Sequence, residues 1–383
     1  MVGVKNSMKF KNIEFLRFVF ASIIVYCHLG LLTSTFQQIP SYFHVSLGMF
    51  FAQNAVDFFF ILSGFLFAFT FELNRDINVF DFLKKKVIRL WPVLAFSIVG
   101  YICLAIINVS SYGTNIYNYL YGLIFLDNIG VTKVHVGPSW YVSSLVFVSL
   151  FYFYLYKTCS VKVANLITGI LTWFSYAYMI NYDDGFIKNY IVTDNNVFNM
   201  GLMRGLGGMG LGIFLCNTYQ YYKDKINPNK LICSAFELVI FYWIIFNLFF
   251  YNFYIKNVMI FIVLFVVLIW LFLNKKGYIS QFFDSNISVW LGKISYSLFL
   301  THLLVIYTIK TFWWNQSNVL ILKYPNLVLA GIFLISIIFA VLVRILIEKP
   351  QNKLFCKLGY LKYYLFVFTT MLLIFTGIHC FVL

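Results

Sequence analysis

Arg17 and His28 lie in one apolar stretch, KNIEFLRFVFASIIVYCHLG, and could act on the same substrate. In a helix of about 100° and 1.5 Å per residue, this spacing puts both side chains on one face, about 16 Å apart along the axis. If this stretch spans a membrane from the cytoplasm outward, Arg17 lies near its cytoplasmic end and His28 lies deeper in the bundle. A cation and an imidazole so placed suit an extended anionic substrate such as acyl-CoA. Its phosphates would contact Arg17 and its reactive end would reach His28. Alternatively, Arg17 reaches the membrane surface and pairs with Glu14, and His28 hydrogen-bonds a neighbouring helix.

A second histidine, His302, occurs in the stretch WLGKISYSLFLTHLLV, about as far into the membrane as His28. Two imidazoles at matched depth on two helices can meet, so we expect both rings at one site. Ser295 lies seven residues before His302 and therefore on nearly the same helix face. The alternative for His302 is a structural hydrogen bond between helices.

Asp57 precedes FFFILSGFLF, and a carboxylate inside a membrane needs a basic partner. We expect His28 or Arg17 to be that partner. Ser63 and Gly64, in the same stretch, are small residues of the kind that let membrane helices approach closely.

Further cations accompany the apolar stretches. Lys86 and Arg89 are three residues apart, share a helix face and could contact phosphates, although basic residues beside a span also anchor it. Arg204 stands among glycines, which indicates either tight packing or a helix loosened around a substrate. Glu237, early in another apolar stretch, has no evident partner in the sequence.

These residues belong to a chain of 383 residues that is 62% hydrophobic and 11% charged. Soluble domains have about 45–50% apolar and about 25% charged residues, so the composition excludes an ordinary soluble enzyme, a disordered chain and a nucleic-acid binder. Stretches long enough to cross a bilayer fall at 13–33, 48–72, 92–109, 139–157, 163–181, 198–219, 232–252, 257–274, 288–309, 325–347 and 363–383. The run 116–126 is shorter, as in a re-entrant or interfacial segment. We predict an all-α, polytopic integral membrane bundle of about 10–11 transmembrane helices.

Basic residues predict the orientation of this bundle. With a cytoplasmic N-terminus, most of the 28 Lys and Arg residues fall in cytoplasmic loops, and the outer loops hold few. The formal charge of +15 therefore follows mainly from topology and requires no nucleic-acid partner. The scattered cysteines have no metal-ligand spacing, so we expect no metal.

In order and spacing, these residues resemble the acyltransferase-3 family of multi-span bacterial membrane enzymes. The resemblance covers about residues 9–352. It rests on these positions: Arg17 and His28; Asp57 before Phe59-Phe60-x-x-Ser63-Gly64-Phe65; Arg89 before Trp91-Pro92; Trp140; Arg204; Ser295-Tyr296-Ser297 before His302; and Glu348-Lys349-Pro350. Two motifs depart from the family pattern: Lys86 replaces the first arginine of Arg-x-x-Arg, and Trp140-Tyr-Val-Ser-Ser-Leu145 lacks the usual glutamate.

The resemblance implies an O-acetyltransferase that moves acetyl from cytoplasmic acetyl-CoA to a hydroxyl of a cell-surface polysaccharide such as lipopolysaccharide O-antigen. It implies a bacterial inner-membrane protein with an acyltransferase domain at 9–352, followed by a cytoplasmic linker and final transmembrane helix at 353–383. His28 would be the base or acyl carrier, supported by His302 and Asp57. The remaining expected site residues are Arg17, Lys86 and Arg89 for CoA, and Ser63, Trp140, Arg204 and Ser295 for substrate. The alternative function is a transporter of a lipid-linked glycan, but we detect no inverted repeat that would favour it.

Overall fold

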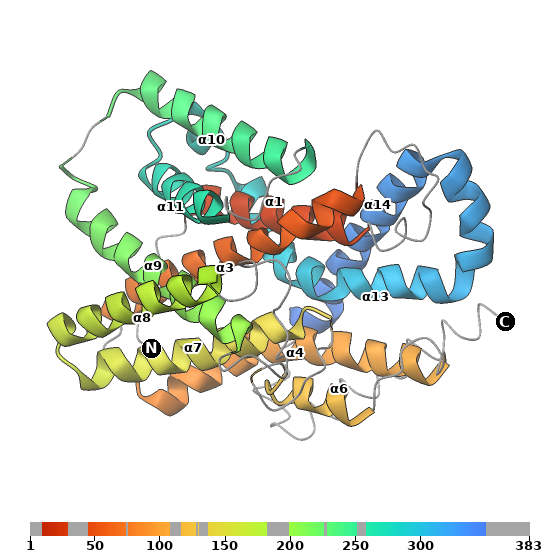
Figure 1. Cartoon of the computed structure of the whole chain (residues 1–383), viewed down its shortest axis with the longest axis horizontal. Coiled ribbons are helices and arrows are strands. Elements are labelled where there is room, and N and C mark those ends of the chain that lie inside the picture. The colour runs from red at the N-terminus through yellow and green to blue at the C-terminus, as the bar shows by residue number, and fades with distance from the viewer. Residues whose placement is uncertain are drawn as a thin grey trace.

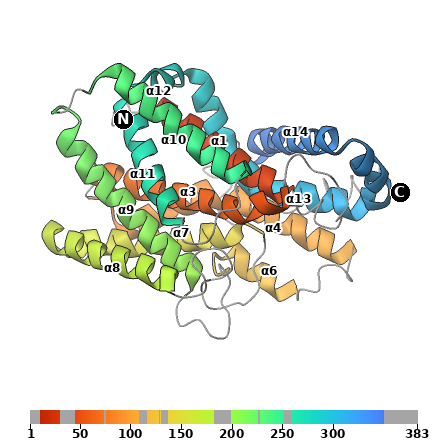
Figure 2. The ribbon, with the colours of Figure 1, turned by 45° about the horizontal axis from the view of Figure 1, so that its top comes forward.

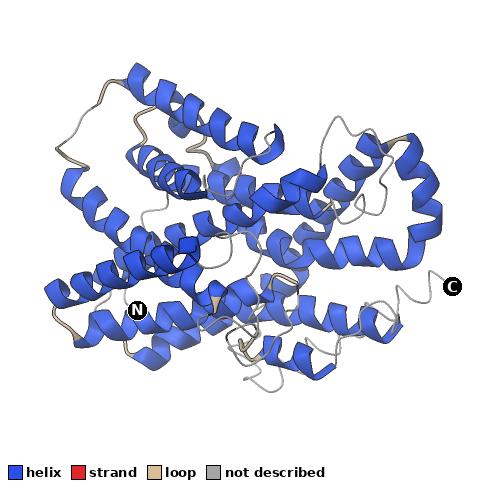
Figure 3. Cartoon of the chain, viewed as in Figure 1, coloured by secondary structure: helices blue, strands red, loops and turns tan. Residues whose placement is uncertain are grey.

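The computed structural model describes residues 10–29, 45–73, 76–107, 116–127, 129, 137–181, 199–225, 228–250 and 258–349. Within these ranges the regular structure is helical, with no strand (Figure 3). The helices are α1 (Lys11–His28), α3 (Val45–Leu73), α4 (Val79–Ile107), α6 (Ile116–Leu123), α7 (Ser139–Thr158), α8 (Val161–Asn181), α9 (Met200–Tyr222), α10 (Lys230–Phe250), α11 (Val258–Asn274), α12 (Tyr278–Phe282), α13 (Asn286–Lys323) and α14 (Pro325–Val343), which continues into the π-helical turn η2 (Arg344–Glu348).

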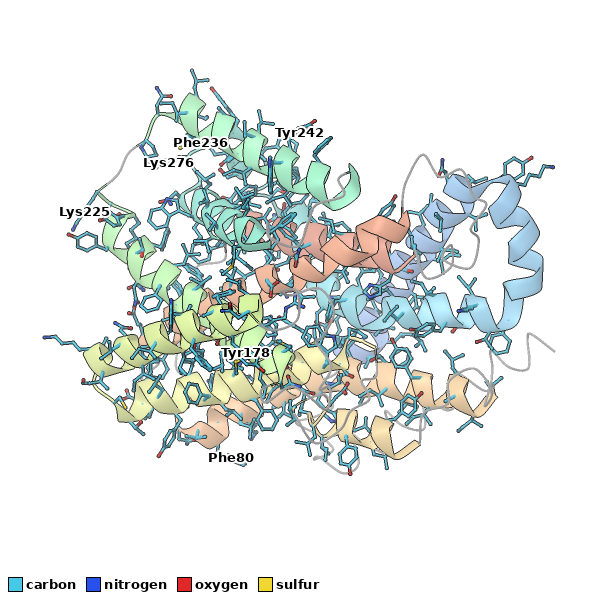
Figure 4. The ribbon with its side chains drawn as sticks, viewed as in Figure 1. Phe80, Tyr178, Lys225, Phe236, Tyr242 and Lys276 are labelled. Atoms are coloured by element: carbon cyan, nitrogen blue, oxygen red, sulfur yellow. The ribbon has the colours of Figure 1, made fainter. Side chains whose placement is uncertain are left out.

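The predicted all-α polytopic membrane bundle is confirmed. Within the described ranges, 6 helices are long and apolar enough to cross a membrane. They comprise Asn54–Glu72, Val79–Ile107, Ser139–Thr158, Val161–Asn181, Asn286–Phe312 and Asn326–Glu348. Large apolar or aromatic side chains on their periphery and on α10, such as Phe80, Phe236 and Tyr242, are exposed and suit contact with lipid (Figure 4).

Two helix lengths bear on the sequence predictions. α6 has 8 residues, too few to cross a bilayer, as expected for the run 116–126. α13 has 38 residues and runs well beyond the predicted stretch 288–309. No glycine or proline lies between Gly292 and Pro325, so no helix-breaking residue ends α13 before Lys323, and Pro325 then begins α14. The predicted segment 353–383 lies outside the described residues.

Glycines bring α3 and α9 together. A Cβ atom on Gly64 would overlap the backbone of Met209, and one on Gly212 would overlap the carbonyl of Ile61. Asp57 bonds Arg204 and, farther along both helices, Glu72 accepts a hydrogen bond from Gln220, so α3 and α9 run in parallel. Because α9 is an unbroken helix of 23 residues, the glycines around Arg204 serve close packing, and the alternative of a loosened helix is not observed.

α1 lies in the middle of the bundle, packed against both α3 and α13 (Figures 1 and 2). On the α3 side, the rings of Phe20 and Phe58 stack with their centroids 4.1 Å apart. On the other side, α13 packs along α1 and also against α14. The central position of α1 surrounds Arg17 and His28 with residues from distant parts of the chain.

Candidate active site

The imidazoles of His28 and His302 meet where α1 packs on α13. Nε2 of His302 lies 3.3 Å from Nδ1 of His28, and the ring centroids are 4.9 Å apart. His302 is fully buried and His28 is half-buried. The prediction that matched depth brings these two rings together is confirmed.

Backbone contacts determine which ring nitrogens carry protons. Nδ1 of His28 lies 2.8 Å from the carbonyl oxygen of Ile24, and Nδ1 of His302 lies 3.1 Å from that of Leu298. A carbonyl can only accept, so each Nδ1 donates. In a neutral pair, Nε2 of His302 then accepts from the shared Nδ1–H of His28. This assignment leaves Nε2 of His28 with a free lone pair, and no described residue hydrogen-bonds to it.

Arg17 pairs with Glu14, one turn away on α1. The two groups are 2.8 Å apart, and their side chains are 16% and 28% exposed, respectively. Glu14 fits against α13 because Gly292 has no side chain there: a Cβ atom on Gly292 would overlap Glu14. The alternative weighed for Arg17, a local ion pair, is therefore what the structure shows, with Arg17 still partly open to an anion.

Arg89 of α4 lies within electrostatic range of this ion pair. It interacts electrostatically with Arg17 and Glu14 of α1, with Tyr296 of α13 and with Glu348 at the end of η2. Two arginines and two carboxylates therefore interact electrostatically at one level of the bundle. We call Glu14, Arg17, Arg89 and Glu348 the arginine cluster.

The sequence prediction did not include Glu348 among the site residues. Its carboxylate accepts a hydrogen bond of 2.9 Å from Ser297 and interacts electrostatically with Arg17 and Arg89. The π-helical turn, closed by a 2.9 Å bond from the Lys349 amide to the Arg344 carbonyl, sets its position. Such turns often mark functional sites. The sequence feature that could have indicated Glu348 is its carboxylate directly after the strongly apolar stretch 325–347.

Lys86 and Arg89 lie on one face of α4, but their side chains have different partners. The Lys86 ammonium donates to Ser149 of α7 at 2.8 Å and lies 5.3 Å from the centroid of the Phe82 ring. Arg89 reaches the arginine cluster and Lys86 bonds to α7, so Arg89 is better placed for an anion held at Arg17.

The expected partner of Asp57 is corrected. Its carboxylate accepts two hydrogen bonds from Arg204 of α9, at 3.0 and 2.8 Å, and neither His28 nor Arg17 is its counter-ion. Both members of the pair are almost fully buried. The parallel packing of α3 and α9 brings the two residues level, although they are 147 positions apart in the chain.

The other three expected substrate residues lie in different surroundings. Trp140 belongs with the Asp57–Arg204 pair, because the Arg204 guanidinium carbon lies 5.8 Å from the centre of its ring. Ser63 hydrogen-bonds the side chain of Tyr141, which also interacts electrostatically with Arg17 and Arg89. Ser295 is buried and donates to the Gly292 carbonyl of its own helix at 2.7 Å.

Glu237, unassigned from the sequence, has a structural role. Its buried carboxylate accepts from the backbone amides of Ile279 and Ser280, at 3.1 and 3.2 Å. Ser234, one turn earlier on α10, accepts from the amide of Tyr278 at 2.9 Å. Together these side chains bind the first turn of α12 to α10.

Comparison with known families identifies the class. The model of the acyltransferase-3 family, an acyltransferase domain, matches residues 10–347. The chain belongs to this family. Searches of curated proteins and of solved structures found no match. The acyltransferase-3 assignment makes the chain a membrane acyltransferase. The matched residues contain the histidine pair, the Asp57–Arg204 pair and the arginine cluster apart from Glu348, which directly follows them.

Acyl transfer needs a basic or nucleophilic atom and a means of holding the donor. In this acyltransferase, Nε2 of His28 is such an atom. Arg17 lies on the same helix toward its N-terminal end, and Arg89 interacts electrostatically with Arg17. Among the described residues, no group of three or more His, Cys, Asp or Glu side chains could hold a metal ion.

Proposed function

We propose that the protein is an O-acetyltransferase that moves an acetyl group from cytoplasmic acetyl-CoA to a hydroxyl of a cell-surface polysaccharide, such as lipopolysaccharide O-antigen. The observation that carries the proposal is the set of ring contacts of His28 and His302, from which the tautomer of His28 follows. Two carbonyl contacts and the second histidine direct its proton to Nδ1, so that Nε2 offers a lone pair inside a membrane acyltransferase domain.

Donor binding would use the arginine cluster. A helix places Arg17 about 16 Å from His28 along α1, and Arg89 lies close to Arg17. CoA phosphates at these two arginines would let the thioester extend along α1 toward His28. Phosphate binding would require Arg17 to loosen its bond to Glu14. Lys86, on the same face of α4, would add positive charge near the inner end.

In the simplest mechanism, Nε2 of His28 removes the proton of the acceptor hydroxyl. The hydroxyl oxygen attacks the acetyl carbonyl carbon, the C–S bond breaks, and the CoA thiolate takes the proton from the imidazolium. His302 accepts from Nδ1–H of His28 and supports its orientation throughout. In the alternative mechanism, Nε2 attacks the thioester carbon, the C–S bond breaks, and CoA thiolate leaves an acetyl-imidazolium on His28. The acceptor hydroxyl then attacks the acetyl carbon, the N–C bond breaks, and the hydroxyl proton passes to the CoA thiolate.

The proposed location is a bacterial inner membrane with the N-terminus in the cytoplasm. The basic loops support it: Lys225 follows α9 and Lys276 follows α11, and both project at the same end of the molecule (Figure 4). His28 ends α1 toward the opposite side. An acetyl group would thus travel from CoA on one side to a glycan acceptor near the other.

The test is the acetyl content of the surface polysaccharide in cells that carry His28→Ala. We expect loss of O-acetylation at unchanged protein level, and normal acetylation would contradict the proposal. Purified protein also distinguishes a transporter, because an acetyltransferase releases free CoA from acetyl-CoA when acceptor is present and a transporter does not.

A further inference from the structure

A second group of buried polar side chains lies in the N-terminal halves of α3 and α7, facing the first turn of α9. Asn54 is 1% exposed, and neither its amide nitrogen nor its amide oxygen has a hydrogen-bond partner among the described residues. Ser144 is fully buried, and its hydroxyl also has none. An unpaired polar group is costly in a membrane interior, so unsatisfied groups gathered in one place indicate a missing ligand.

Helix register places these groups together. Asp57 bonds Arg204, and three residues earlier on the parallel helices Asn54 lies level with Gly201. A Cβ atom on Gly201 would lie 2.9 Å from the Ser144 hydroxyl oxygen and 3.2 Å from the Trp140 ring. Asn54 is on the α9-facing side of α3, like Asp57. The unpaired amide, the unpaired hydroxyl and the indole therefore surround one turn of α9.

The charge of this group indicates the class of ligand. Asp57 and Arg204 neutralise each other through two hydrogen bonds, so the group carries no net charge. The arginine cluster also balances two arginines against two carboxylates, but its Arg17–Glu14 pair is partly exposed, so Arg17 can still meet a phosphate. An amide that both donates and accepts, a hydroxyl and an aromatic ring suit the hydroxyls and apolar faces of a neutral sugar.

Its position fits the second substrate. The Phe20–Phe58 stack puts these two residues at one level of the bundle. From there, His28 lies about 12 Å and Asn54 about 6 Å farther toward the outer side, at 1.5 Å per residue. The ring of Tyr141, next to Trp140, is 5.3 Å from that of Phe299, which is 6.4 Å from His302.

We propose that Asn54, Ser144 and Trp140, braced by the Asp57–Arg204 pair, form the subsite that binds the sugar ring of the acceptor. This inference rests on the proposed O-acetyltransferase function. It separates the two substrates: the donor anion at the arginine cluster, and a neutral sugar at Asn54 and Ser144.

The test uses the full-length protein in detergent, with acetyl-CoA as donor and, as acceptor, unacetylated surface polysaccharide from cells lacking this chain. We expect Asn54→Leu and Ser144→Ala each to raise the KM for polysaccharide by roughly five- to tenfold, the loss expected for one neutral hydrogen bond. The KM for acetyl-CoA should change less than about twofold. Ser336→Ala is the matched control, because Ser336 is buried and bonds only within α14.

An unchanged KM for polysaccharide in both variants overturns the subsite. If the wild-type protein releases no CoA when acetyl-CoA and polysaccharide are both present, the O-acetyltransferase function itself fails, and the subsite fails with it. Thermal unfolding adds a ligand-free readout. Asn12→Leu breaks a paired buried amide and should lower Tm. Asn54→Leu should not lower it, and a comparable drop would show that Asn54 is a structural residue.

Discussion

At the scale of single residues, the environment of His28 accounts for its chemistry. Its Nδ1 proton is directed to the Ile24 carbonyl, 2.8 Å away, and Nε2 of His302 lies 3.3 Å from the same nitrogen. These contacts fix the ring orientation and the tautomer before substrate arrives. His302 therefore acts as a positioning residue through His28.

Replacing His302 should lower turnover without weakening donor binding. We expect His302→Ala to reduce kcat for CoA release by roughly tenfold or more, from the lost hydrogen bond and orientation of His28. The KM for acetyl-CoA should stay unchanged. His302→Gln, whose amide oxygen can accept from Nδ1–H, should recover part of the rate. An equal loss in both variants, accompanied by a lower Tm, would point to a structural role instead.

Glu14 competes with the donor for Arg17, because the two are 2.8 Å apart. Glu14→Gln should free Arg17 for phosphate and lower the KM for acetyl-CoA by up to about fivefold, as expected from the strength of partly exposed ion pairs. The KM should also rise more steeply with salt. Asp284→Asn is the matched control, since Asp284 pairs with Lys275 at 2.9 Å at similar exposure away from the arginine cluster. A higher KM in Glu14→Gln would contradict this view.

The sequence predicted some of these contacts and not others. His28 and His302 could be paired because each is a lone histidine at a similar depth in its stretch. The Asp57–Arg204 bond could not be predicted, because it depends on which helix packs beside α3 and in which register. Glycine packing of α3 on α9 determines both the neighbouring helix and the register. A single sequence does not show which helix packs beside which.

At the scale of elements, the Asp57–Arg204 pair joins α3 to α9 inside the bundle. Both side chains are almost fully buried and share two hydrogen bonds. Asp57→Leu removes the carboxylate that neutralises a buried guanidinium and should lower the unfolding free energy by about 3–5 kcal/mol. The double variant Asp57→Leu/Arg204→Met should be more stable than Asp57→Leu alone. Thermal unfolding of the three proteins measures this, and additive losses would show that the pair is not coupled.

The same interface predicts a contrast between two glycines. Gly212→Ala would place its methyl group on the Ile61 carbonyl and on the backbone of α3, and should destabilise the protein by about 1–3 kcal/mol through overpacking. Gly331→Ala on α14 meets no atom within 4 Å and should be neutral or slightly stabilising. Comparable Tm values for the two variants would contradict the close α3–α9 packing.

At the scale of the whole molecule, apolar stretches predicted nearly all the described helices. Their lengths were less predictable, since α13 continues to Lys323 for lack of a helix breaker. The site required three-dimensional packing, because α1, α4, α13 and η2 each contribute to the arginine cluster or to the histidine pair. The order of motifs nevertheless indicated the acyltransferase-3 family, which the family match over residues 10–347 confirms.

The arrangement of the molecule also suggests how acetyl would cross the membrane. The arginine cluster lies on the inner side of the histidine pair, because Arg17 precedes His28 on α1, which runs from the inner side outward in the proposed orientation. By helix register, Asn54 lies between the levels of Arg17 and His28, about 6 Å short of His28. A donor entering from the inner side and an acceptor entering from the outer side would meet between the arginine cluster and the histidine pair.

The most direct test of the central claim is transfer of labelled acetyl from acetyl-CoA into the polysaccharide by sealed, inverted membrane vesicles, which expose the cytoplasmic face. Vesicles with the wild-type protein should incorporate label into the glycan. Vesicles with His28→Ala at equal protein level should lose at least about a hundredfold in rate, as expected when a general base is removed. Undiminished incorporation in the His28→Ala vesicles would contradict the account.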